Sequence, residues 1–591
     1  MSAVPPTVAP ARPEIVTDEI PRRRSGWIEL ATSADHKGVG VMYLGSALSF
    51  LVLAVVELVL MRVQLIVPEN TMIDPIIFDQ LLSAFGATAV VLFGIPVAIG
   101  LMTYVVPLQI GARGLAFPRL AALSFWLYLA GGVTLYASFL YRPAEAGVNP
   151  LPPLSDDVFS PTGGIDAWIA GVGLAVLGFV LAAINIVATI RTMRAPGMAW
   201  RRVPLFSWAS VVSSYVVIVT GAVMLAALTM LLIDRQWEGV FFDAGEGGSP
   251  ILWQHLSWLF FTGAYLVMLL PAFGAISEIL PVFARKPPFG HRAIAGSFVA
   301  IGALALIAWM QNMYSAPLPL GWTILAMTAA IALVVPVGLV FFNWLATLWG
   351  GVLRMRAPLL FALGAISTVA IGLAGELVQS VIPVSWQLSN TTSATADTGY
   401  ALVGGSVFGT FAALYYWFPK ITGRTMGEAL ARISFWTLLV GVHLTFLPMF
   451  FAALLGQPVD LYRYYEGTDL HGYNLVSSIG SFVLATGILT TLANAAYSAR
   501  NGARTGHDPW AGDTLEWFAL SPPPPHNFDA IPDVRSTEPL RDIREAVRER
   551  TEAWEPPPGL ERPAAEAQAE RRGADTTEAA GQSGGERPPV A

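Results

Sequence analysis

Residues 39 to 60 read VGVMYLGSALSFLVLAVVELVL, an almost unbroken apolar stretch that decides the kind of fold to expect. A helix rises about 1.5 Å per residue, so roughly 20 apolar residues cross the ~30 Å hydrocarbon core of a bilayer. Runs of this kind recur along the chain, each about 20 to 30 residues long. We therefore expect about twelve transmembrane helices, starting near residues 39, 80, 117, 167, 205, 251, 293, 321, 358, 398, 430 and 474.

The composition supports an all-α integral membrane protein. Of the 591 residues, 54% are hydrophobic and 13% are charged, whereas soluble domains carry about 25% charged residues. The polar, Pro-rich start leads into a long span, not into the short apolar core of a signal peptide. There is no cysteine, so any metal would need His, Met, carboxylate or hydroxyl ligands.

The basic residues sort by loop and predict the orientation. Alternate loops carry an excess of Lys and Arg, which marks the cytoplasmic side of a membrane protein. The opposite loops are mainly acidic, with Glu69, Asp74, Asp156 and Asp243 among them. We expect a multi-pass protein of the cell inner (plasma) membrane with both termini in the cytoplasm. The basic loops contain Arg113, Arg191, Arg194, Arg201, Arg202, Arg285, Lys286, Arg292, Arg354, Arg356, Lys420, Arg424 and Arg432.

Shifts in composition divide the chain into four parts. Residues 1–38 form a cytoplasmic N-terminal segment and residues 39–500 the twelve-helix transmembrane domain. Residues 501–561 form a polar, Pro-rich cytoplasmic extension. Residues 562–591 are rich in Ala, Glu, Gly and Arg, so we predict a disordered tail there.

Several motifs resemble subunit I of the haem-copper oxidases, in the family's order, over roughly residues 25 to 540. They lie before the first span, within the spans and after the twelfth. This resemblance to cytochrome c oxidase subunit I implies a twelve-helix bundle that holds a low-spin haem, a high-spin haem and a copper ion. The motifs are ADHK (34–37), YVVPLQIGARGLAFPRLAALSF (104–125), WQHL (253–256), LPAFGAISEILP (270–281), YYWFPKITGR (415–424), DPW (508–510), DTLEW (513–517) and SPPPPHNF (521–528).

The resemblance also indicates that the metal-ligand histidines are missing. Haem iron and copper in such a site need imidazole nitrogens, and the substituted residues are poor ligands or none. The haem-ligand positions match Phe85, Asp397 and Gly399. The copper-ligand positions match Thr262, Gln311 and Asn312, and the family's redox tyrosine matches Leu266.

The residues that support the metals in the family are replaced as well. Val459 and Asp460 stand at the propionate-binding arginines, and Ser389 and Asn390 at a His-Asp pair near a magnesium ion. The polar residues of both proton paths are lost, since the matching positions are Val340, Thr103, Gly114 and Ala121. Of the seven histidines in the chain, only His255 and His443 fall within or next to a span.

Ionisable groups within a span cost roughly 2.5 to 3.5 kcal/mol to insert, so each of them suggests a hypothesis. Glu57 and Glu376 could relay a proton, or pair across helices with Arg62 or His443. For His443 alone, we expect a hydrogen bond to a neighbouring helix, with haem ligation as the alternative. Asp397 follows a polar stretch, which predicts a helix N-cap. The pair Gly404-Gly405 predicts close helix packing, and Arg62 and Glu278 match bundle residues of the family.

Three functions stay open. The leading hypothesis is a haem-free, catalytically inactive protein that acts as a structural or assembly subunit of a respiratory complex. It predicts no catalytic residues and no cofactors, with the lipid bilayer and other membrane subunits as partners and no nucleic acid. The alternatives are an active terminal oxidase subunit with unrecognised ligands, and a carrier that uses the vacated cavity.

Overall fold

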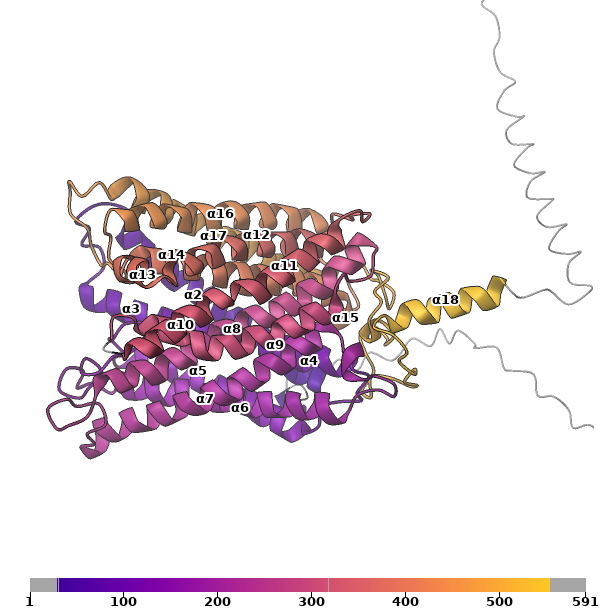
Figure 1. Cartoon of the computed structure of the whole chain (residues 1–591), viewed down its shortest axis with the longest axis horizontal. Coiled ribbons are helices and arrows are strands. Elements are labelled where there is room, and N and C mark those ends of the chain that lie inside the picture. Colours follow the sequence, from indigo (N-terminus) through magenta and orange to yellow (C-terminus); the bar gives the residue numbers. More distant parts are fainter. Residues whose placement is uncertain (1–28, 30, 317, 553–591) are drawn as a thin grey trace, which may run out of the picture.

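Long helices lie side by side in a bundle, and one helix projects from its end (Figure 1). This computed structural model describes residues 29, 31–316 and 318–552. Within that range, twelve helices or joined helices are long and apolar enough to cross a membrane, and strand pairing is limited to two isolated bridges. The prediction of an all-α protein with twelve spans is confirmed. The tenth span begins at Thr392, where the hydropathy placed it near residue 398.

The twelve spans comprise both single helices and joined segments. The second and tenth spans each contain a π-helical segment, η1 and η5, which the hydropathy pattern did not indicate. The spans are α2 (His36–Gln64), α3 (Pro75–Gly86) with η1 (Ala87–Gly94) and α4 (Ile95–Gln109), α5 (Pro118–Ala137) with η2 (Ser138–Leu140), α6 (Gly164–Thr192), α7 (Leu205–Trp237), α8 (Pro250–Ala284), α9 (His291–Ala308) with η4 (Trp309–Met313), α10 (Leu320–Ala332) with α11 (Val334–Leu348), α12 (Ala357–Gln379), α14 (Thr392–Leu402) with η5 (Val403–Phe408) and α15 (Gly409–Thr422), α16 (Glu428–Leu454), and α17 (His471–Asn501).

Shorter helices lie in the connections and the C-terminal extension: η3 (Trp200–Arg202), α13 (Ile382–Leu388), η6 (Leu515–Trp517) and α18 (Pro539–Glu552). Several of the longer helices start on ordinary capping signals. The Asp35 carboxylate accepts a hydrogen bond from the backbone N–H of Lys37, and Asp74 caps α3 in the same way. These side chains satisfy N–H groups that the first turn of a helix leaves without a partner.

Consecutive spans pack against each other as pairs, most extensively α5 with α6, α7 with α8 and α16 with α17. The last span, α17, returns to contact α2, the first. The second, sixth and tenth spans are the most deeply buried, so they form the centre of the bundle. Four of the six positions that the resemblance assigns to metal ligands lie on these three spans.

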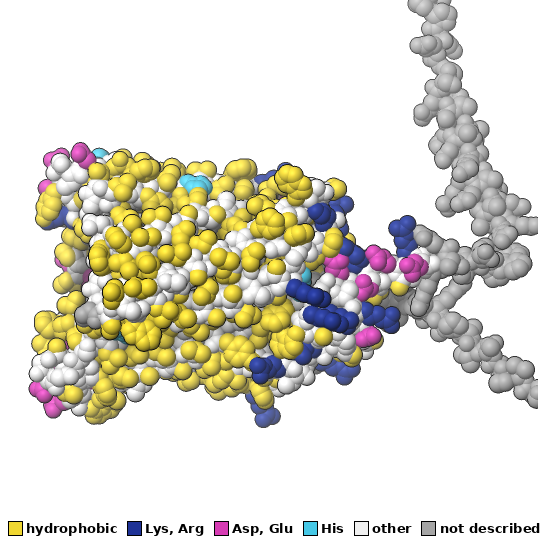
Figure 2. Space-filling model, viewed as in Figure 1, with side chains coloured by type: hydrophobic (Ala, Val, Ile, Leu, Met, Phe, Trp, Pro, Cys, Tyr) yellow, Lys and Arg dark blue, Asp and Glu magenta, His cyan; other side chains and the backbone are white. Residues whose placement is uncertain are grey.

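The side of the bundle seen in Figure 2 is largely apolar, as contact with lipid requires. Lys and Arg side chains gather at the end from which α18 projects, which we call the basic end. We call the opposite end, where α3, α8 and α14 begin, the far end. The basic end includes the start of α2 and the C-terminal extension, so both ends of the described chain lie there.

The C-terminal extension, residues 502 to 552, folds back onto the basic end. His36 lies within hydrogen-bond distance of Asn527, at 3.1 Å, and Arg202 donates to the carbonyl of Val534 at 2.9 Å. The ammonium of Lys420 donates to the carbonyls of His507 and Ala519. The predicted disordered tail, residues 562–591, lies outside the described residues. So do residues 1–28 and 30 of the predicted N-terminal segment.

Candidate functional site

The three positions matched to copper ligands lie close together. Thr262 is on α8, and Gln311 and Asn312 are on η4. The Asn312 amide donates to the Thr262 hydroxyl at 3.5 Å and to the carbonyl of Trp309 at 3.1 Å. The Asn312 amide nitrogen and the Thr262 hydroxyl are therefore hydrogen-bonded to each other, whereas a metal ion would need free donor atoms.

Gln311 joins a second polar group from α12. Its amide donates to the Glu376 carboxylate at 3.3 Å, and its carbonyl oxygen accepts from the Ser380 hydroxyl at 3.3 Å. Glu376, which we predicted as an intramembrane polar site, thus lies beside a residue that the resemblance matches to a copper ligand. The arrangement is a hydrogen-bonded network of amides, hydroxyls and a carboxylate.

The two tenth-span positions lie in a packed interior. Asp397 is fully buried; one carboxylate oxygen accepts from the Gln379 amide, and the other has no partner among the described residues. A Cβ at Gly399 would collide with the ring of Phe446, which α16 places against this glycine. The ring occupies the space that a ligand side chain at this position would need.

The predicted N-cap at Asp397 is wrong. The helix α14 begins at Thr392, five residues earlier, and Thr391 caps it by accepting a hydrogen bond from the N–H of Ser393 at 3.3 Å. The polar residues before Asp397 are themselves helical, because Thr391 supplies an alternative cap.

Phe85, at the remaining haem-ligand position, belongs to a small apolar cluster near the far end. Its neighbours there include Met61, Ile73 and Phe78. A phenyl ring has no lone pair to offer a metal, and in this cluster it contributes apolar packing.

The residues at the six positions that the resemblance assigns to metal ligands do not fit two haems and a copper ion. One is an apolar ring, one is a glycine covered by a ring, and four are hydroxyl, amide or carboxylate groups bound to one another or to neighbours. None offers an imidazole, the donor that keeps haem iron and copper bound in such a site. The side chains at these positions are suited instead to packing and to hydrogen bonding between helices.

The histidines near the membrane have protein partners. His443 Nδ1 lies 2.9 Å from the hydroxyl of Tyr400 on α14, which confirms the predicted bond to a neighbouring helix. His255 Nδ1 lies 2.7 Å from the carbonyl of Ile251. Two of the positions that the resemblance matches to residues supporting the metals are also in contact. The backbone N–H of Val459 donates to the carbonyl of Asn390 at 3.0 Å.

The predicted cross-helix ion pairs do not form among the described residues. Arg62 donates to the carbonyl of Asn474 on α17 at 3.1 Å, and Glu57 accepts from the hydroxyl of Tyr136 on α5 at 2.9 Å. Arg62 is turned toward α17 and Glu57 toward α5, so the two charges cannot pair. Tyr136 was not predicted, because 79 positions separate it from Glu57.

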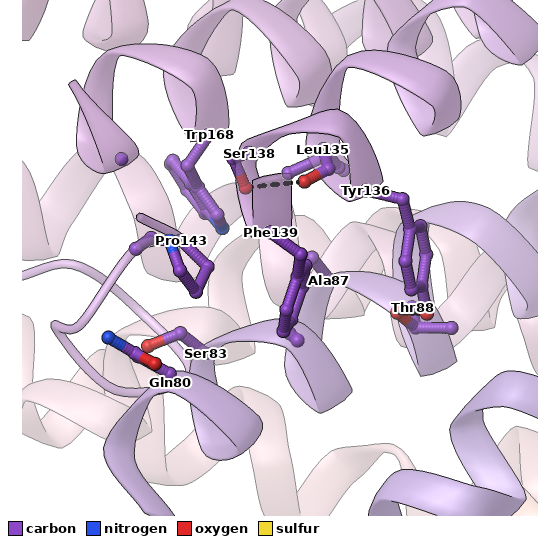
Figure 3. Close-up of a pocket in the computed structure, with 13 residues that line it drawn as sticks. Gln80, Ser83, Ala87, Thr88, Leu135, Tyr136, Ser138, Phe139, Pro143 and Trp168 are labelled. Carbon is purple, nitrogen blue, oxygen red and sulfur yellow. Dashed lines mark hydrogen bonds between the residues drawn. The ribbon is translucent and has the colours of Figure 1, made fainter. Parts of the chain in front are cut away.

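Glu57 lies near a cavity at the far end, between α3, η1, α5 and α6 (Figure 3). Thr88 and Tyr136 line its inner part, and Gln80 and Ser83 line another part. Its volume of about 20 Å³ leaves room for roughly one or two waters.

The packing of Gly404 and Gly405 agrees with the prediction of close helix contact. A Cβ on Gly404 would meet Thr368 of α12, and one on Gly405 would meet Leu269 of α8. The π-helical η5 that contains both glycines therefore packs directly against two spans of the core.

Twelve apolar spans around a packed and largely apolar core, with a few buried polar groups, define a polytopic α-helical membrane protein. Residues 38–483 match the family described as Cytochrome C and Quinol oxidase polypeptide I, and the chain belongs to this family. Cytochrome c oxidase subunit 1 of Corynebacterium efficiens is 39% identical over 551 residues, covering 92% of this chain and 94% of that protein. Cytochrome c oxidase subunit 1 of Bacillus subtilis is 36% identical over 512 residues, covering 86% and 82%.

A solved structure of a heme-copper terminal oxidase dimer has a similar fold. The TM-score is 0.67 at 16% sequence identity, over 86% of this chain and 89% of that one. The predicted resemblance to subunit I is therefore confirmed at the level of family and fold.

Proposed function

We propose that this chain is a haem-free, catalytically inactive member of the subunit I family, and that it acts as a structural or assembly subunit of a respiratory complex. The plasma membrane is its expected location, with the basic end in the cytoplasm.

The Phe446 ring packed on Gly399 carries the haem-free part of the proposal. A glycine alone leaves room for an external ligand, but a glycine under an aromatic ring leaves none. Filling this space also avoids an empty interior, which would destabilise the bundle in proportion to its volume. The polar network around Gln311 and Glu376 supports the same conclusion for copper.

Two features support a structural role. The relatives are named as subunits, which makes assembly with other chains the expected setting. The C-terminal extension keeps the family-like motifs and holds buried hydrogen bonds to the bundle, such as the indole N–H of Trp417 on Glu516 at 3.3 Å. An ordered basic end of this kind offers a fixed surface to a partner.

Mild detergent extraction of the tagged full chain from its native membranes tests the structural role. We expect other respiratory membrane subunits, an oxidase core or a cytochrome among them, to co-purify in fixed ratio. An unrelated twelve-span protein with the same tag serves as the control and should not bring them down.

Two results would contradict the proposal in different ways. Recovery of the chain alone, together with solute uptake by vesicles that contain only this chain, would favour the carrier. Oxygen reduction by the purified chain would favour an active oxidase with unrecognised ligands. Recovery of the chain alone without uptake would also contradict the structural role.

A further inference from the structure

The carboxyl group of Glu57 has one partner where two would be expected. Its side chain is 6% exposed and lies in the half of α2 nearer the far end. One oxygen accepts from Tyr136, and the other is buried without a hydrogen-bond partner among the described residues. A carboxylate in a span without a cation is costly, so a site of this kind favours a bound proton.

A chain of hydroxyl groups connects this carboxyl to the cavity. The Tyr136 hydroxyl is 2.9 Å from Glu57 and 2.8 Å from the hydroxyl of Thr88 on η1. Tyr136 and Thr88 both line the cavity, as Figure 3 shows. Each hydroxyl can accept one hydrogen bond while it donates another, so the chain can pass a proton in either direction.

The cavity holds further features that suit water. The indole N–H of Trp168, a lining residue, is buried without a partner among the described residues. Ser83 and Gln80 add polar atoms, and Gln80 donates to Glu145 in the far-end loop at 3.3 Å. A buried water is stable where about three polar groups can bond to it. Trp168, Ser83 and Gln80 supply polar atoms to a lining that is otherwise mainly apolar.

The charged groups around Glu57 leave it without an electrostatic partner. On α2 itself, Arg62 is turned to Asn474 of α17. From α3 the nearest acid is Asp79, α4 and η1 carry no charged residue, and α5 contributes Tyr136. At the mouth, Glu145 pairs with the exposed Arg142 at 3.3 Å.

We propose that Glu57 is a proton-binding site that exchanges with the aqueous phase at the far end through Tyr136, Thr88 and water in this cavity. On uptake, Tyr136 gives its proton to the Glu57 carboxylate and receives the proton of Thr88. Thr88 is reprotonated by a hydrated proton from the aqueous phase, which leaves neutral water in the cavity. Release runs in reverse, and no other bond or redox state changes. This proposal does not depend on whether metals are bound.

Infrared difference spectroscopy of the purified full chain in H2O and D2O tests the proposal. The wild type minus Glu57→Gln difference should show the C=O band of a protonated carboxylic acid, and this band should shift when D2O replaces H2O. Thr88→Val should slow that shift by about tenfold or more, since a lost link that costs ~1.4 kcal/mol changes a rate tenfold.

Matched controls separate a broken relay from a general disturbance. Thr445→Val removes a buried hydroxyl that bonds only to its own helix, at the carbonyl of Gly441. Tyr136→Phe should slow the shift as Thr88→Val does, since it removes the next hydroxyl of the chain. Tyr43→Phe, which removes a buried phenol that bonds to Ser124, serves as its control. Both controls should exchange at the wild-type rate.

Three results would overturn the proposal. One is an unchanged spectrum in Glu57→Gln, which would mean that Glu57 carries no proton. Another is a Glu57 band that exchanges only as slowly as the most protected backbone amides, which would mean that the site is sealed. The third is equal exchange in Thr88→Val and Thr445→Val. Where Glu57→Gln does not fold, Glu57→Asp keeps the acid and should move the same C=O band, which assigns the band to this position. The Thr88→Val and Thr445→Val comparison then follows that band.

Discussion

Gly399 shows how one residue can decide what the interior holds. Because Gly399 has no side chain, the Phe446 ring packs against the backbone of α14 and joins the buried core. A side chain of any size at this position would need the ring to move. Two residues on different helices thus exclude a ligand together, and neither does so alone.

Gly399→Ala should therefore destabilise the bundle. Overpacking a filled core costs about 1–3 kcal/mol, which thermal unfolding in detergent would report as a lower Tm. Adding Phe446→Leu should recover part of the loss by making room. Gly296→Ala is the control, since a Cβ there meets no atom within 4 Å. An equal Tm for the two alanine variants would show that Phe446 does not fill the space as described.

The polar residues could be found from the sequence, but their partners could not. Glu57, Arg62, Glu376 and His443 stand out because ionisable groups are rare inside spans. Their bonds to Tyr136, Asn474, Gln311 and Tyr400 cross between helices. Hydropathy places a residue in a span but says nothing about which neighbour its side chain faces. The ion pairs with Arg62 or His443, which we gave as the alternative to a proton relay, therefore could not be decided from the sequence, and the described residues do not form them.

At the scale of elements, Lys420 is one of the buried side chains that hold the C-terminal extension on the bundle. The ammonium of Lys420, which is fully buried, donates to the carbonyls of His507, Ala519 and Leu520 and lies over the ring of Trp517. This side chain satisfies backbone groups that would otherwise lack partners at the basic end.

Lys420→Met should loosen the extension while leaving the spans intact. Unpaired buried carbonyls cost about 1–3 kcal/mol each, so hydrogen exchange in residues 505–521 should rise strongly. Lys286→Met is the matched control, because Lys286 bonds to carbonyls at the C-terminal end of α11, at Ala346 and Trp349, and not to the extension. Unchanged protection of residues 505–521 in the Lys420 variant would show that Lys420 does not hold this part of the extension.

Glu538 makes the extension sensitive to pH. Desolvation raises its pKa from 4.5 to about 6, against the lowering effect of Arg541, with which it forms an ion pair at 2.6 Å. The folded state therefore binds the proton more tightly than the unfolded state does. The stabilisation that the folded state gains from this bound proton is complete below pH 4.5 and is lost as the pH rises through about 6.

Hydrogen exchange of residues 513–541, corrected for intrinsic rates, should show tighter docking at pH 5 than at pH 7. Glu538→Gln should reduce this difference, and Glu549→Gln, at an exposed position on α18, should not. Desolvation also raises the pKa of Asp508, so part of the difference should remain in the Glu538 variant. Equal protection of the wild type at both pH values would contradict the prediction.

The number of transmembrane spans could be predicted from the sequence better than their π-helical segments and their exact starts. Long apolar runs identify all twelve spans because length and hydrophobicity alone decide insertion. The π-helical segments η1 and η5 have no such signal, since they depend on how the second and tenth spans pack in the core. The start of α14 was missed because Thr391 caps it inside a polar stretch that the hydropathy pattern assigns to a loop.

At the scale of the whole molecule, the separation of charges between the two ends predicts the orientation. The basic end should face the cytoplasm. The chain has no cysteine, so single-cysteine variants report accessibility without background. On intact cells a membrane-impermeant maleimide should label Glu246→Cys at the far end and not Arg201→Cys at the basic end. Permeabilised cells should label both, and the reverse pattern on intact cells would contradict the orientation.

Under our proposal, family membership and cofactor content separate at this scale. The fold and the sequence belong to the oxidase subunit I family over most of the chain. The interior positions on which the chemistry of that family depends hold packed rings and bonded amides. A bundle can keep its helices in place by apolar packing and still lose the few donors that bind metals.

The haem and copper content of the isolated chain tests this separation most directly. Reduced-minus-oxidised spectra and metal analysis of the full chain, made in cells supplied with haem and copper, should give far less than one haem or copper per chain. A small residual haem signal should disappear in His443→Ala and persist in His255→Ala if His443 holds it. Two haems and one copper per chain would contradict the haem-free assignment.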